Sequence, residues 1–171
     1  MAYYALTLTA DKAGNIVWSS VSDLIGRKNA YRGYLGIGAL LYLVLELVGN
    51  GSKAVFLICA LIIISFYGSG FSTVPAYLRD LFGTYEVGAI HGRLLTAWSA
   101  AGVFGPFIVN FIADKQKAAG LSGPDLYSLS FRIMIVLLVI GFVCNELIRP
   151  VNQRYHEPVG SSVPTTAERM A

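Results

Sequence analysis

Long apolar runs separated by short polar stretches dominate the pattern of this chain. Four runs reach about the 20 residues that a helix needs to cross the hydrocarbon core of a bilayer, at residues 31–48, 54–78, 94–113 and 126–148. They are too long and too continuously apolar to be strands of a membrane barrel, in which apolar and polar residues alternate. The pattern therefore predicts four complete transmembrane helices.

The first 25 residues are harder to interpret. The mostly apolar part, residues 13–25, is too short to span a bilayer alone. Extending it to residue 2 places Asp11 and Lys12 near the middle, where each charge costs roughly 2.5–3.5 kcal/mol on insertion scales. Adjacent residues point about 100° apart on a helix and cannot pair face to face. We therefore expect residues 1–25 to be the end of a helix whose beginning is missing or altered.

Composition supports a bilayer as the chain's surroundings. Hydrophobic residues make up 55% of the 171 residues and charged residues 13%, against about 25% charged in soluble domains. This excludes a soluble globule and a disordered chain. The net charge of +3 is modest, and the cations stand in short clusters between apolar runs, which argues against a nucleic-acid partner. The fold class predicted is an all-α membrane protein.

The cations also predict an orientation. Eight would share one side of the membrane and four the other, and the richer side should be cytoplasmic. The eight are Arg27, Lys28, Arg32, Arg79, Arg93, Arg149, Arg154 and Arg169, and the four are Lys53, Lys115, Lys117 and Arg132.

We therefore expect a multi-pass protein of the plasma (inner) membrane with a cytoplasmic C-terminus. Residues 1–150 would form the helix bundle, and residues 151–171, rich in proline, glycine, serine and threonine, a disordered cytoplasmic tail. The N-terminus lacks the basic and apolar pattern of a cleaved secretory signal.

Proline and glycine interrupt two of the predicted spans. The second contains Gly68, Gly70 and Pro75, and the third contains Gly102, Gly105 and Pro106. We predict helix kinks at Pro75, Gly105 and Pro106, because such residues bend membrane helices in transporters and channels. Close packing in an ordinary bundle explains the glycines equally well.

The most specific local pattern is the segment from Ser22 to Lys28, where a helix leaves the membrane. Asp23 can meet the positive end of a neighbouring helix, and Gly26 allows a tight turn. Arg27 and Lys28 stay in the interface and can pair with acids. Together they could form a latch that is made in one conformation and broken in another. The alternative is a plain helix end with a basic pair that sets topology.

A resemblance to a known family rests on this segment and a second one. Residues 18–28, from Trp18 to Lys28, resemble the signature loop of the major facilitator superfamily, which occurs once in each six-helix half of such a transporter. Residues 70–83 and 90–106, with Thr96-Ala97-Trp98-Ser99, resemble the C-terminal half of the oxalate/formate antiporter branch, which is monocarboxylate-transporter-like. The resemblance covers residues 13–149.

The resemblance implies a partial major facilitator fold: part of the eighth helix and all of the ninth to twelfth. It implies a secondary transporter, an antiporter in this branch, that carries a small carboxylate by alternating access. The expected partner is the missing N-terminal half. The alternative is a truncated or split-gene membrane subunit with no transport activity of its own.

Two departures bear on the substrate. Members that carry oxalate are thought to face it with cations in the eighth and eleventh helices. Here the first position falls near Asn15, and the eleventh helix carries Trp98 and no lysine or arginine after Arg93 within the apolar span. A desolvated dianion needs such partners, so the sequence favours a monocarboxylate or another small solute over oxalate.

Polar and aromatic residues within the spans are candidates for a substrate cavity. These are Asn15, Tyr67, Ser69, Trp98 and Ser99. Their alternative role is hydrogen bonding between helices, worth about 0.6 kcal/mol on average. Glu46 could carry a proton, but it lies close to Gly49 and more easily reaches the outer interface.

Nothing in the sequence indicates catalysis or a cofactor. Cys59 and Cys144 fall in apolar runs, as packing residues do. His91 is expected in a loop and His156 in the tail, each without a second ligand at metal spacing. No nucleophile elbow, phosphate loop or pair of catalytic acids is present in the sequence, so we predict neither an enzyme nor a metal site.

Overall fold

The computed structural model describes residues 2–48 and 51–152, and within them it contains only helices and their connections. The α-helices are α1 (Ala2–Ile25), α2 (Arg27–Leu47), α3 (Lys53–Phe82), α4 (Val87–Ala118) and α5 (Ser128–Leu147), with a short 3₁₀ helix, η1 (Gly123–Tyr127), before α5. The prediction of an all-α fold is confirmed. The predicted tail lies outside the described residues except for Val151 and Asn152.

Four helical segments are long and apolar enough to cross a membrane, as the sequence predicts. They are α2, α3, α4 and the segment Asp125–Leu147 that includes α5. The helix α1 has 24 residues and is about 36 Å long at the α-helical rise, but it carries Asp11 and Lys12 near its middle. That α1 is the end of a longer helix remains a prediction.

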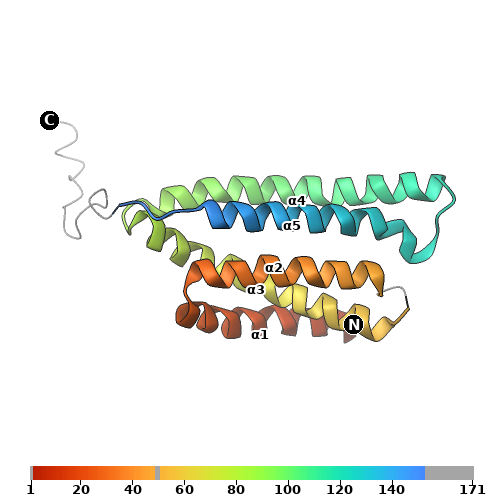
Figure 1. Cartoon of the computed structure of the whole chain (residues 1–171), viewed down its shortest axis with the longest axis horizontal. Helices are drawn as coiled ribbons and strands as arrows, with labels where there is room; N and C mark the ends of the chain where they lie inside the picture. Colours follow the sequence, from red (N-terminus) through yellow and green to blue (C-terminus); the bar gives the residue numbers. More distant parts are fainter. Residues whose placement is uncertain (1, 49–50, 153–171) are drawn as a thin grey trace.

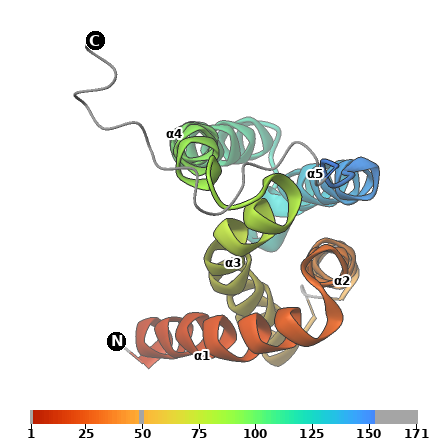
Figure 2. The same cartoon turned by 90° about the vertical axis from the view of Figure 1, so that its left-hand side faces the viewer.

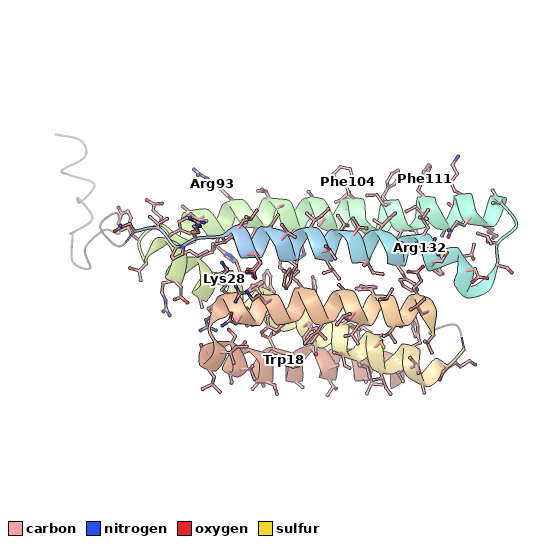
Figure 3. All side chains as sticks on the ribbon, in the orientation of Figure 1. Trp18, Lys28, Arg93, Phe104, Phe111 and Arg132 are labelled. Carbon is pink, nitrogen blue, oxygen red and sulfur yellow. The ribbon has the colours of Figure 1, made fainter. Side chains whose placement is uncertain are left out.

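The helix α3 lies at the centre of the bundle. It contacts α1, α2 and α4, and α5 packs along α2 (Figures 1 and 2). Successive helices run in opposite directions, so the α1–α2 and α3–α4 turns and the end of α5 share one end of the molecule (Figure 1). The described members of the two predicted cation groups therefore lie at opposite ends, with Lys28 and Arg93 at one end and Arg132 towards the other (Figure 3).

The connection between α3 and α4 is much shorter than predicted. The sequence suggests a loop over residues 79–93, but only residues 83–86 separate the two helices. Gly83 ends α3 with φ at 82°, and its N–H donates to the Arg79 carbonyl at 2.9 Å. His91 therefore lies within α4 and not in a loop, which corrects the prediction. Backbone hydrogen bonding continues past the point where the side chains stop being apolar.

The helices α1 and α3 approach so closely that glycine is required at two contacts. A Cβ at Gly14 would lie 2.4 Å from the Ser65 carbonyl oxygen, and one at Gly68 would lie 2.3 Å from Asp11 Oδ1. Small residues allow membrane helices to approach in this way. The contact is extended by a hydrogen bond from Trp18 Nε1 to Ser65 Oγ at 3.2 Å.

An aromatic cluster joins α1, α2 and α3. Trp18 packs edge-on against Phe66, with ring centroids 5.0 Å apart, and Tyr34 lies 5.5 Å from Phe66. Tyr31 lies 5.6 Å from Tyr34 and 5.1 Å from Tyr77. These rings form the most continuous apolar packing among the described residues.

Glycines also shape the contact of α2 with α5. The position of a Cβ on Gly38 lies 3.6 Å from Leu138, and that on Gly141 lies 3.4 Å from Leu35. Ion pairs join the same two helices near both ends, Arg32 with Glu146 and Arg132 with Glu46. The structure thus pairs Glu46 with a cation of α5.

This second ion pair gives a testable asymmetry. The Glu46 side chain is 14% exposed and that of Arg132 is 68% exposed. Removing the arginine therefore leaves the more buried charge without its partner. We expect Arg132→Gln to destabilise the chain by about 1 kcal/mol, and Glu46→Gln by about 0.3 kcal/mol. Thermal unfolding in detergent measures both. Equal losses for the two variants would contradict the asymmetry, and the double variant should lose less than the sum.

Candidate functional site

The turn between α1 and α2 carries the segment that the sequence singles out. Gly26 adopts φ 87° and ψ 143° directly before α2, in the left-handed range of φ that favours glycine. The tight turn brings the end of α1 against the beginning of α2. The Gly26 carbonyl oxygen accepts a hydrogen bond from the Ala30 N–H at 3.0 Å, and this bond begins α2.

Asp23 and Arg27 form an ion pair across this turn. The Arg27 side chain is 15% exposed and that of Asp23 61% exposed. Arg27 Nη1 also donates to Ser22 Oγ at 2.6 Å, and Ser22 is fully buried on α1. The guanidinium is therefore held in place while the carboxylate remains accessible to a new partner.

Lys28 closes the C-terminal end of α5. Its Nζ donates to the carbonyl oxygens of Glu146 at 2.9 Å and Ile148 at 2.8 Å. The last carbonyls of a helix have no hydrogen-bond partner within the helix and carry the negative end of its dipole. A lysine there donates to these carbonyls and also places a positive charge beside the negative end. Lys28 lies at the end of the bundle where α2 begins (Figure 3).

Asn145 completes the connections at this end. Its Nδ2 donates to the Lys28 carbonyl at 3.2 Å, and its Oδ1 accepts from the Tyr77 hydroxyl at 3.0 Å. Asn145 is buried, and its two bonds link α5 to both α2 and α3. A small cavity of about 270 Å³ lies beside this network, with Arg27, Lys28 and Asp80 among its walls. The segment in which the sequence predicts a latch, with Asp23, Gly26, Arg27 and Lys28, is thus connected through Lys28 to Asn145 and Glu146 of α5, and we keep the name latch for those four residues.

A second feature is a cavity of about 660 Å³ between α2, α3, α4 and α5. Tyr67 and Trp98 both line it, with ring centroids 6.1 Å apart and nearly perpendicular planes. The Phe71 ring lies on the same wall, with its centroid 3.9 Å from that of the Trp98 ring. The cavity is lined by Tyr31, Tyr34, Leu35, Gly38, Tyr42, Ile63, Phe66, Tyr67, Gly70, Phe71, Val74, Ala97, Trp98, Ala101, Met134, Leu137 and Leu138.

The remaining candidates for a substrate cavity lie elsewhere. Ser69 is fully buried, and its hydroxyl donates to the Phe66 carbonyl at 3.1 Å within α3. Ser99 is exposed and donates to the Leu95 carbonyl at 3.0 Å. Asn15 lies on α1, which contributes no residue to the cavity. The structure thus brings Tyr67 and Trp98 together and leaves the other three outside.

Several wall residues are absent from the sequence-based candidates. Tyr31 and Tyr34 on α2 are the clearest, and their spacing of three residues on one helix face is a signal that could have found them. Met134 on α5 has no comparable signal. It becomes a wall residue only because α5 packs along α2.

Pro75 and Pro106 lie inside continuous helices, α3 and α4. Each removes one backbone hydrogen bond from its helix. That these positions and Gly105 act as kinks remains a prediction.

Comparison with known proteins gives one match. The family model of the Major Facilitator Superfamily matches residues 2–169. No curated protein and no solved structure matches the chain.

Proposed function

The chain belongs to the major facilitator superfamily of membrane transporters, and from this premise we propose that it carries a small organic anion as the C-terminal portion of a secondary transporter. Its fold is a partial, all-α major facilitator fold with four candidate membrane spans. In such transporters two halves rock against each other and expose a site near the middle of the membrane to each side in turn.

The observation that carries the proposal is the latch. The Asp23–Arg27 ion pair lies at a helix turn, with the carboxylate exposed and the guanidinium mostly buried. Such a pair can be exchanged for a contact with another half of the transporter, because the Asp23 carboxylate is mostly exposed and an ion pair with an exposed partner contributes little free energy by itself. In our proposal the latch closes one conformation on the cytoplasmic side of the inner membrane, where the C-terminus also lies.

The proposed substrate is a small carboxylate, and antiport is the proposed mode. The support is the similarity of residues 70–106 to the oxalate/formate antiporter branch. The cavity walls favour a monoanion, because no charged residue is among them and a dianion in such a place would lack compensation.

Uptake by proteoliposomes that contain the complete transporter, with this chain as its C-terminal portion, tests this proposal. We expect Asp23→Asn to lower the exchange of radiolabelled carboxylates (formate and benzoate) at least ~tenfold, a loss of about 1.4 kcal/mol. The matched control is Asp114→Asn, which makes the same substitution of asparagine for aspartate at an exposed position near the opposite end of the bundle. Uptake that Asp23→Asn leaves unchanged would contradict the role of the latch.

A second candidate function is a membrane subunit that does not transport alone. It is favoured by α4, which contacts α3 and α5 but has no buried residue among its described positions, and so leaves much of its surface to lipid or to further helices. The partner would be the N-terminal half of the transporter. Uptake that depends on co-expression of a separately encoded N-terminal half would identify the chain as such a subunit, and uptake by the chain alone would exclude it.

A further inference from the structure

The chemistry of the 660 Å³ cavity restricts what it can hold. Its walls consist of aromatic rings, aliphatic side chains and glycine, without a charged residue. The volume lies within the range of about 300–1,000 Å³ typical of small-molecule sites. Formate or oxalate would leave most of this space empty and would bring a charge against apolar walls, which is unfavourable.

Two of the tyrosine hydroxyls on the walls are already engaged. Tyr31 donates to the Gly70 carbonyl at 2.5 Å, and Tyr34 donates to the Trp18 carbonyl at 3.1 Å. These rings therefore present mainly carbon surface to the cavity. They favour an aromatic or branched group, because rings pack well edge-to-face on other rings.

Two of the donors that remain belong to Tyr67 and Trp98, which are exposed at the edge of the cavity. Among the described residues, neither Trp98 Nε1 nor the Tyr67 hydroxyl has a hydrogen-bond partner, and the two rings are in contact. Tyr67 is 61% exposed and Trp98 38% exposed. A carboxylate that accepts from both would keep part of its hydration, while an apolar group attached to it reached into the cavity. The Tyr42 hydroxyl also has no hydrogen-bond partner within the part of the chain that the structure describes, but the Tyr42 ring packs against that of Phe131 in α5, with ring centroids 6.1 Å apart.

We infer that the solute is a monocarboxylate with an aromatic or branched apolar group, which packs between α2, α3, α4 and α5 while the carboxylate accepts hydrogen bonds from Trp98 and Tyr67. This inference rests on the proposed function, because it names the substrate class of the same transporter. It also assigns the cavity to the apolar part of the solute and the Tyr67–Trp98 edge to its charge.

Trp98 provides a direct reporter of binding. In the Trp18→Phe variant, Trp98 is the one remaining tryptophan of the chain. We would titrate this variant in phosphatidylcholine nanodiscs with benzoate, formate, oxalate and benzyl alcohol, and follow the tryptophan fluorescence. Benzoate should bind at least ~tenfold more tightly than each of the other three.

Paired variants locate the two parts of the solute. Tyr67→Phe should weaken benzoate binding about threefold and leave benzyl alcohol binding unchanged, whereas Tyr127→Phe should change neither, because Tyr127 is exposed and does not line the cavity. Gly70→Leu should abolish binding, because a Cβ there meets no atom within 4 Å and the side chain would fill the cavity. Gly102→Leu is the control, since its Cβ is equally unhindered but Gly102 does not line the cavity.

Three results of the binding experiment, and one result of the uptake experiment, would overturn the inference. Binding of benzyl alcohol as tight as that of benzoate would make this a site for neutral lipophilic molecules. Tighter binding of formate or oxalate would indicate a hydrophilic solute, and no response to any probe would leave the cavity without a ligand of this class. Uptake of formate without a preference for benzoate would overturn the inference alone, whereas uptake of no carboxylate would overturn the proposed function.

Discussion

Replacing Gly14 with leucine is expected to separate α1 from α3 and to destabilise the chain by about 3 kcal/mol. The position of a Cβ on Gly14 lies 2.4 Å from the carbonyl oxygen of Ser65 and 2.6 Å from its Cα. Both are backbone atoms, so no side-chain rotation relieves the overlap and the helices must move apart. The hydrogen bonds from Trp18 to Ser65 at 3.2 Å and between Ser19 and Ser72 at 3.0 Å would be lost with the contact.

The matched control for this variant is Gly33→Leu on α2. It makes the same exchange within a helix, but a Cβ there meets no atom within 4 Å. Comparison of the two therefore cancels the gain in helix propensity that leucine brings. Thermal unfolding in detergent, followed by circular dichroism, measures the difference. A Gly14→Leu protein as stable as the control would mean that α1 and α3 do not approach closely.

The helices could be predicted from the sequence because long apolar runs leave few alternatives. Their ends could not be placed as well, and α4 shows why. It begins at Val87 and not near residue 94, because hydropathy indicates which residues favour lipid, whereas the helix ends where backbone hydrogen bonding stops. The turn at Gly26 was easier to predict, since a glycine between two helical segments is a local signal for a turn.

The walls of the cavity depend on how each helix is rotated about its axis. Tyr67 and Ser69 are two residues apart and therefore point in different directions on α3. Tyr67 faces the cavity, whereas Ser69 is fully buried. A span that is apolar on most sides gives little indication of which face is which. The sequence therefore identified residue types suited to a cavity without separating those that share a face.

Lys28 shows a second limit of prediction from the sequence, which concerns contacts between distant parts of the chain. The sequence predicts a position in the membrane interface for Lys28, but it does not predict its partners, which are the carbonyls of Glu146 and Ile148 at the far end of the chain. No local pattern connects residues so far apart. The contact follows from the packing of α5 along α2, which glycines on both helices permit.

The same packing predicts a large effect at Asn145. Leucine has the same branched side chain as asparagine, with two methyl groups in place of the amide oxygen and nitrogen, so Asn145→Leu mainly removes hydrogen bonds. Asn145 is 4% exposed and Tyr77 9% exposed, and the Tyr77 hydroxyl would lose its acceptor at 3.0 Å. A buried polar group left unpaired costs about 1–3 kcal/mol, and we expect a loss of about 2 kcal/mol in thermal unfolding.

A double-mutant cycle with Tyr77→Phe separates this hydrogen bond from packing. Tyr77→Phe alone leaves the Asn145 Oδ1 without its donor, whereas the double variant removes both polar partners and leaves two apolar groups in contact. The double variant should therefore be destabilised less than the two single variants together, by about 1 kcal/mol. Strict additivity would mean that the two side chains do not interact. In that case this hydrogen bond would not join α3 to α5.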